Sequence, residues 1–250
     1  RDFRLAGVAL DDDKRRRFAD LAQELAQLQA TFEQNLMDAT DDFQHHAMDK
    51  PEVAGLPKDL LERARRAAED NELDGWLLAL DPPTYISVQT HAESEDLRRL
   101  YYEAWVTRAS DQGPHADRWD NGSLIDQILE LRHEASRLLG FNSYAEFSLA
   151  TKMASMPSEV LKFLENLAVK SKPVAQRELD ELTAFAGREL KPWDLAYFAE
   201  RLKQDRFALA DDELRPYFPL PRVLEGMFRV AETLFDVRLT ERHDVATWHP

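Results

Sequence analysis

The dipeptide His133-Glu134 is the first place in this sequence where neighbouring side chains could hold a metal ion. A zinc-binding helix of the H-E-x-x-H type needs its second histidine one turn further on, so that both imidazole rings face one metal. That position holds Arg137, a cation that would repel zinc, and no H-E-x-x-H occurs elsewhere in the chain. The sequence therefore predicts no metal ligand and no catalytic residue in this segment.

Other residues that could do chemistry also favour structural explanations. The adjacent His45 and His46 would lie about 100° apart on a helix, so they cannot share a metal as an i, i+4 pair does; we expect partly exposed histidines at a helix end. The basic run from Lys14 to Arg17 follows three aspartates, which favours a solvated helix face over a nucleic-acid or targeting patch. There is no G-x-S-x-G turn and no glycine-rich phosphate loop. The residues alone therefore assign no catalytic role and no metal ligand, and leave the substrate-binding residues unknown.

The composition describes the kind of protein that could position a site. Of the 250 residues, 44% are hydrophobic and 32% are charged, which is typical of a soluble globular chain. The net charge of −15 argues against nucleic acid or an anionic membrane as a partner. No apolar run approaches the roughly 20 residues that span a bilayer, and no signal peptide opens the chain. The absence of cysteine suits a reducing compartment, so we expect a cytoplasmic protein.

The N-terminal third predicts two long helices. Asp11 to Asp13 offer caps for the first helix, in which apolar residues recur every three or four positions as far as Phe43. Prolines at positions 51 and 57 break the pattern, and Leu60 to Ala68 form the stripe of a second helix. We expect these two helices to pack antiparallel as a long helical hairpin.

Residues 76–90 change the pattern from helix to strand. Trp76–Leu80 is a short apolar run, Asp81 to Thr84 is typical of a turn, and Tyr85–Gln89 alternates apolar and polar residues. The segment predicts a small β-hairpin that packs on helices, because a lone hairpin is only marginally stable. It also marks a possible seam between subdomains near residues 75–90, within one N-terminal helical lobe that spans residues 1–250.

The remainder of the chain is again mostly helical. Apolar stripes predict helices over residues 93–109, 123–139, 141–153, 157–190 and 192–207. Gly140 suits the left-handed residue that ends a helix, and Pro173 predicts a kink or a break near Lys172. The predicted fold class is mainly α, a multi-helix lobe with one small β-hairpin.

The C-terminal segment combines proline-rich bends with one amphipathic helix. Asp211 or Asp212 can cap a short helical turn, and three prolines then interrupt the helix before it restarts after Pro221. Val237–Thr240 alternates like a strand, and Val245–Trp248 begins another extended run. We expect this edge to be unfinished and to be completed by further polypeptide.

Several of these segments resemble one family in order. They are WLLALDPPTYISVQT from Trp76, TRASDQGP from Thr107, LRHEASRLLGFNSYAEFSLATKMA from Leu131, KPWDLAYFAERLK from Lys191, and LRPYFP, VLEGMF and WHP within the last 40 residues. The chain is similar to the oligopeptidase A and thimet-oligopeptidase family of zinc metallopeptidases over nearly its whole length.

The resemblance implies a metalloendopeptidase that hydrolyses short peptides in a deep channel between two largely helical lobes. Zinc would be held by an H-E-x-x-H helix and a downstream glutamate, neither of which this sequence contains. The expected role of the chain is therefore the N-terminal scaffold and channel wall. Its partners would be peptide substrates and the C-terminal catalytic half of the same protein, and the chain alone would bind no zinc and be inactive. The alternative is an acidic helical scaffold or interaction protein without catalysis, which would lack an H-E-x-x-H helix in the reading frame beyond Pro250.

Overall fold

The computed structural model describes residues 2–208, 215–242 and 244–245, and the chain divides into two compact units, residues 1–200 and 201–250. Helices dominate both units, which confirms the mainly α fold class. None of the helices in the described ranges combines the length and apolarity that crossing a membrane requires. A seam near residues 75–90 stays a prediction.

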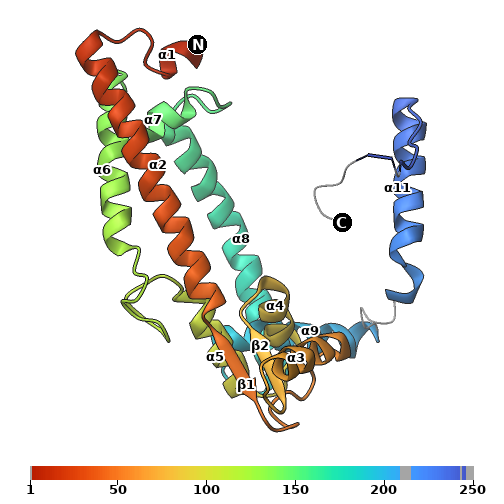
Figure 1. The fold of residues 1–250 in the computed structure, drawn as a ribbon. Helices are drawn as coiled ribbons and strands as arrows, with labels where there is room; N and C mark the ends of the chain where they lie inside the picture. The colour runs from red at the N-terminus through yellow and green to blue at the C-terminus, as the bar shows by residue number, and fades with distance from the viewer. Residues whose placement is uncertain (1, 209–214, 243, 246–250) are drawn as a thin grey trace. The chain divides into compact units, whose positions relative to one another are not determined.

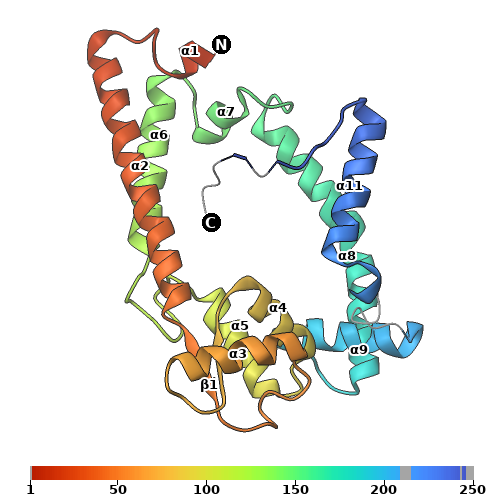
Figure 2. The ribbon, with the colours of Figure 1, turned by 45° about the vertical axis from the view of Figure 1, so that its right-hand side comes forward.

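In the first unit, the short α1 (Asp2–Leu5) precedes the long α2 (Asp12–Asp41), which begins at the predicted cap. The side chain of Asp11 accepts a hydrogen bond of 3.0 Å from the backbone N–H of Lys14. Helix α2 packs antiparallel along α6 (Gly122–Leu138), and both views show the two side by side (Figure 1, Figure 2). Buried Asn121 joins them at one end, because it accepts a hydrogen bond from Asn35 and donates one to the carbonyl of Phe32.

The predicted partner of α2 was the helix that follows it, and the structure differs. That helix, α3 (Lys58–Asp70), begins and ends close to prediction but packs on strand β2 (Trp76–Ala79). The reason is that β1 (Gln44–Ala47) lies between α2 and α3 and pairs with β2. Because β1 and β2 pair, α3 packs on the sheet. The apolar side of α2 packs against α6 instead.

The predicted β-hairpin is wrong in its pairing. Residues 76–79 do form a strand, but its antiparallel partner is β1, with Gln44 opposite Ala79 and Ala47 opposite Trp76. The expected second strand is instead helix α4 (Pro82–His91). Asp81 caps this helix by accepting hydrogen bonds from the backbone N–H of Thr84 at 2.9 Å and from its hydroxyl at 2.7 Å. Prolines occupy the first two positions of the helix, where they are well tolerated. The same Asp-Pro-Pro-Thr sequence is also typical of a turn, which explains the wrong prediction.

The buried core of this unit surrounds the sheet. Helix α5 (Glu95–Val106) places Tyr101 against it, where the hydroxyl donates to the carbonyl of Leu78 at 3.0 Å and the ring lies edge-on to Phe43. Burial raises the pKa of Tyr101 well above its ordinary value, so its phenol stays protonated. The core consists of Phe43, Ala47, Val53, Leu56, Leu60, Ala64, Leu78, Leu80, Val88, Ala92, Leu97, Tyr101 and Ala104.

Three further helices complete the first unit up to residue 186. Helix α6 is followed by Gly140 at φ +86°, as predicted, and then by the short α7 (Tyr144–Leu149). Helix α8 (Pro157–Ala186) runs without a break through Pro173, so the predicted break is absent. Pro173 has no N–H that could donate to the carbonyl of Val169, four residues earlier. Both residues are exposed, so water can donate a hydrogen bond to that carbonyl instead.

After α8, the chain forms a 3₁₀ turn η1 (Pro192–Asp194) and helix α9 (Leu195–Phe207), close to the predicted helix. The second unit contains η2 (Arg215–Tyr217) and α11 (Leu220–Phe235), which Asp236 ends in a left-handed conformation at φ 50°. Residues 237–240 are irregular in the structure, so the strand expected there does not form. The expected caps Asp211 and Asp212, and Trp248 in the second expected extended run, lie outside the described residues.

Candidate functional site

The His133-Glu134 pair lies on α6, and its glutamate has a structural partner. The carboxylate of Glu134 accepts two hydrogen bonds from the guanidinium of Arg17 on α2, from Nε at 2.7 Å and from Nη2 at 2.7 Å. The hydrogen bonds from Arg17 lower the pKa of Glu134 below its ordinary value. His133 is exposed to solvent beside this pair. Glu134 therefore ties α6 to α2 through Arg17.

The side chains of His45, His46 and the basic run also make local contacts. His45 and His46 lie on strand β1, not at a helix end as predicted; the Nε2 of His45 lies 2.7 Å from Glu52, and that of His46 lies 2.5 Å from the carbonyl of Asp74. The cations of the basic run each pair with an acid: Lys14 with Asp11, Arg15 with Asp12, Arg16 with Asp13 and Arg17 with Glu134. Within the described ranges, no three histidines, aspartates or glutamates come together as a metal site would require.

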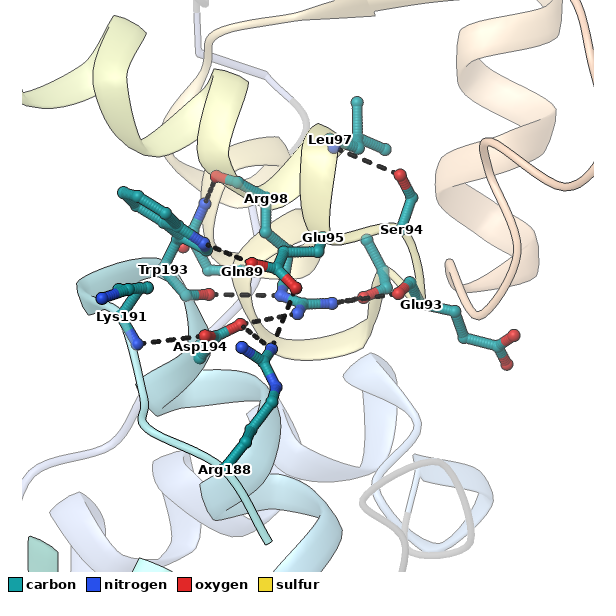
Figure 3. A network of polar contacts seen from close by, with 11 residues as sticks. Gln89, Glu93, Ser94, Glu95, Leu97, Arg98, Arg188, Lys191, Trp193 and Asp194 are labelled. Carbon is teal, nitrogen blue, oxygen red and sulfur yellow. Dashed lines mark hydrogen bonds and ion pairs between the residues drawn. The ribbon is translucent and has the colours of Figure 1, made fainter. Parts of the chain in front are cut away.

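The strongest concentration of charge in the interior is centred on Arg98 of α5 (Figure 3). Its side chain is only 2% exposed, and its guanidinium donates to the backbone carbonyls of Ala92, Glu93 and Trp193 at 2.7, 3.1 and 3.2 Å. A fourth hydrogen bond, of 2.8 Å, goes from Nη2 to Oδ1 of Asp194. The guanidinium also lies 4.3 Å from the ring centre of Tyr197. Arg98 thus binds the connection between α4 and α5 and the turn before α9 at once.

Asp194 is the anionic partner, and its side chain is completely buried. Oδ1 accepts hydrogen bonds from Arg98 and, at 2.9 Å, from Arg188, while Oδ2 accepts one of 3.0 Å from the backbone N–H of Lys191. Burial by itself raises the pKa of Asp194. The hydrogen bonds from Arg98 and the Lys191 N–H, with the charges of both arginines, outweigh burial and hold the pKa below its ordinary value.

An outer pair of side chains closes the network toward solvent. Glu95, in the first turn of α5, accepts a hydrogen bond of 3.0 Å from Arg188 and one of 3.4 Å from the indole N–H of Trp193. Two arginines therefore meet two carboxylates, and the formal charges of the cluster cancel. We call Glu95, Arg98, Arg188 and Asp194 the buried ion cluster.

This cluster is built to hold backbone segments together. Every polar atom that it buries is engaged by another group of the protein, so neither the guanidinium of Arg98 nor the carboxylate of Asp194 is free to transfer a proton. What it fixes is the position of α5 against the segment between α8 and α9.

The sequence interpretation missed this cluster, although one signal was present. Arg98 lies three residues before Tyr101 and next to Leu97, on the inward face of the predicted helix 93–109. A cation on a buried stripe requires a buried anion. Nothing local identifies Asp194 as that anion, since the two residues are 96 positions apart.

A separate hollow lies elsewhere in the first unit, between α1, the end of α6, α7 and the start of α8. Its volume is about 1230 Å³, and Arg4 and Glu146 are the charged residues among its lining. Glu146 is already engaged, since it accepts hydrogen bonds from the backbone N–H of Asn142 at 2.8 Å and from the side-chain amide of Asn142 at 3.4 Å, and it is the acid in the first turn of α7. This hollow offers no pair of acid and base groups for catalysis.

Comparison with known proteins gives matches over the whole chain. Residues 88–250 match the model of Peptidase family M3. The chain is 44% identical to oligopeptidase A of Escherichia coli over 255 aligned residues, 42% identical to oligopeptidase A of Haemophilus influenzae, and 31% identical to dipeptidyl carboxypeptidase of E. coli. These alignments cover 99–100% of the chain but only 37–38% of the relatives. The buried ion cluster lies wholly inside the matched residues 88–250.

Proposed function

The chain belongs to Peptidase family M3, and from that premise we propose that it is the N-terminal portion of a zinc-dependent oligopeptidase that hydrolyses short peptides. The observation that carries the proposal is the 44% identity to E. coli oligopeptidase A across the entire chain. The chain spans 38% of the length of that relative. In a protein of that length, more than half of the residues would therefore lie outside the 250 residues of this chain.

In this proposal, the chain supplies scaffold and channel wall. The zinc that the family implies does not fit the residues described here, because they bring no three potential ligands together and Arg137 stands where a second histidine would be needed. We therefore assign the zinc ligands and the catalytic base to the C-terminal half. No step of the hydrolysis is assigned to this chain.

The buried ion cluster gives the wall its rigidity in this scheme. It joins α5, which packs on the sheet and its core, to the segment that connects α8 with α9. A channel wall must keep its position while peptides enter and leave, because small displacements of groups that position a substrate reduce catalysis strongly. The cluster is thus expected to act through positioning.

A comparison of the 250-residue chain with the complete protein tests the proposal. The complete gene product should cleave a quenched fluorescent peptide, and a chelator should abolish the cleavage. The 250-residue chain should neither cleave the peptide nor retain zinc after dialysis. Chelator-sensitive cleavage by the chain alone would contradict our placement of the active site. A reading frame that ends without an H-E-x-x-H segment would favour the alternative, an acidic helical scaffold or interaction protein.

We also propose a cytoplasmic location, which the absence of cysteine in the sequence supports. A relative from Arabidopsis thaliana, 38% identical, is named probable cytosolic oligopeptidase A, and another, also 38% identical, is named organellar. Cell fractionation with detection of the complete protein distinguishes these locations.

A further inference from the structure

A groove follows the antiparallel helices α2 and α6, which Figure 2 shows side by side. Its wider hollow has a volume of about 480 Å³, and the apolar residues that line it are Phe32, Ile125, Ile128 and Leu129. A second hollow of about 260 Å³ extends to Tyr144 and Phe147 at α7 and shares Gln29 and Arg132 with the first. We call the two hollows the α2–α6 groove. Mostly apolar hollows of a few hundred Å³ with a few polar groups are typical of ligand sites.

Arg132 lines both hollows and is available to an anionic ligand. Its guanidinium lies 5.0 Å from the ring centre of Tyr144, and its side chain makes no hydrogen bond or ion pair with the residues that the structure describes. By contrast, Arg15, Arg16 and Arg17 of α2 each pair with a carboxylate. In a chain with 47 acidic and 32 basic residues, Arg132 is thus a cation whose fork of N–H donors can bind a carboxylate from outside.

The opposite charge lies toward the other end of the wider hollow. Glu33 lines it beside the amide of Gln29, and within the described ranges neither side chain has a hydrogen-bonding or ionic partner. The register of the two helices is fixed by a hydrogen bond of 2.8 Å from Asn35 to Asn121. In this register, Glu33 and Arg132 lie roughly 13 Å apart along the helix axes. The wider hollow therefore has an anion and a cation at its two ends and an apolar floor between them.

We propose that the α2–α6 groove binds short peptides of three or four residues that have free termini and apolar side chains. An extended peptide of this length spans about 10–14 Å, which matches the separation of the two charges. Arg132 binds the terminal carboxylate, Glu33 binds the terminal ammonium group, and the apolar side chains cover the floor. The inference rests on the proposed function, because such peptides are what an oligopeptidase takes up and releases.

The pair of charges favours this ligand over others with apolar parts. A fatty acid offers a carboxylate to Arg132 but no cation to Glu33. A single amino acid is too short to reach both charges. Nucleic acid also lacks a cation for Glu33, and the net charge of −15 repels it.

Photo-crosslinking in the complete protein tests the site directly. The probe is Leu-Ala-Leu with a diazirine analogue of leucine at its first position, and a chelator removes zinc so that the probe is not hydrolysed. After irradiation, peptide mass spectrometry identifies the labelled segments, and the probe concentration at half-maximal labelling measures the affinity. We expect labels within residues 25–33 and 125–132, with half-maximal labelling at about 1 mM probe or below.

The variant Arg132→Gln should raise the half-maximal concentration at least about tenfold, because it removes a charged hydrogen-bond donor. A probe with an amidated C-terminus should bind the unchanged protein equally weakly and should lose no further affinity on Arg132→Gln, since the two changes remove the same contact. A variant that merely disturbed the fold would weaken both probes.

The amino end of the peptide is tested in the same way. Glu33→Gln should weaken the free probe about threefold and leave the binding of an N-acetylated probe unchanged. Arg137→Gln and Glu130→Gln are matched controls, because both side chains are exposed on other sides of α6. Each control should change the half-maximal concentration by less than about twofold.

Two results would overturn the peptide site. One is labelling that occurs only outside the α2–α6 groove, which is also the result expected if another polypeptide segment or a second copy of the chain covers the groove. The other is labelling of the groove that Arg132→Gln leaves unchanged.

A peptidase assay of the same complete protein with zinc restored keeps the two proposals separate. Labelling of the groove without peptidase activity would support the peptide site and reject the proposed function. Peptidase activity without labelling of the groove would reject the peptide site alone.

Discussion

At the scale of single residues, Arg98 and Asp194 pose the sharpest energetic problem in this chain. Two opposite charges are removed almost completely from water, and each would be costly if it stood alone. Their mutual hydrogen bonds, the three carbonyls bound by Arg98 and the second cation Arg188 offset that cost. A buried pair of this kind contributes little net stability over an apolar replacement, but removing one partner leaves the other uncompensated.

We therefore expect Asp194→Asn to lower the free energy of unfolding by about 3–5 kcal/mol. Urea unfolding followed by circular dichroism measures this. The double variant Arg98→Met/Asp194→Asn should lose less than the sum of the two single variants, by roughly 0.5–3 kcal/mol, because the groups interact directly.

The control for this measurement is Glu69→Gln, which removes the exposed ion pair with Arg65. It should change the free energy of unfolding by less than about 0.5 kcal/mol, as is usual for solvated pairs. If Asp194→Asn lowered the free energy of unfolding by no more than Glu69→Gln does, the residues of the ion cluster would not be energetically coupled.

Asp194 should also contribute to the acid sensitivity of the fold. Because its folded pKa lies below the ordinary value of 3.8, the ionised carboxylate adds stability that is complete above that value. This stability is lost as pH falls below 3.8 toward the folded pKa. The difference in unfolding free energy between wild type and Asp194→Asn should stay constant from about pH 7 to pH 5 and shrink below about pH 4. A difference that grows on acidification would contradict the pKa direction.

At the scale of elements, the sequence predicts which segments are helical much better than it predicts their partners. The stripe of α2 identifies an apolar side, but any helix with a complementary side could cover it, and α6 does so from about 80 residues further along the chain. The β-hairpin failed for a different reason. Asp-Pro-Pro-Thr satisfies both the rules for a turn and those for a helix start, and only Trp76–Ala79 pairing with Gln44–Ala47 decides between them.

The cap of α4 offers a test of that correction. Asp81→Ala removes both hydrogen bonds to Thr84 and should cost about 1 kcal/mol of stability, whereas Asp81→Asn should retain most of it. Thermal or urea unfolding of both variants provides the measurement. Equal stability of the alanine variant and wild type would mean that the helix start does not depend on this cap.

At the scale of the whole chain, the buried ion cluster could not have been predicted, because its members come from positions 95 to 194 and meet only after folding. The absence of a zinc motif, in contrast, is a property of sequence alone. Exposed apolar surface and high net charge coexist in this molecule: α8 and α11 expose leucine, valine and phenylalanine side chains on a chain of charge −15.

These two properties predict a salt dependence of self-association. At low ionic strength, repulsion should keep the chain monomeric, and at about 0.5 M salt, where charge interactions are screened beyond a few ångströms, weak oligomers should appear. Sedimentation velocity at two salt concentrations measures the change. Leu164→Glu, which places a charge among the exposed apolar residues of α8, should remain monomeric at high salt, and oligomers that are insensitive to salt would contradict this account.

The route of the chain through its first unit has a consequence for cleaved protein. The loop of residues 107–120 lies between α5 and α6, yet the segments on its two sides are joined by Arg17 with Glu134, by Asn35 with Asn121 and by Arg98 with Asp194. A single proteolytic cut in this loop should therefore yield two peptides that stay associated and elute together from a sizing column. They should separate only in denaturant, which makes the cut site a natural position for splitting the chain into fragments that reassemble without a covalent link.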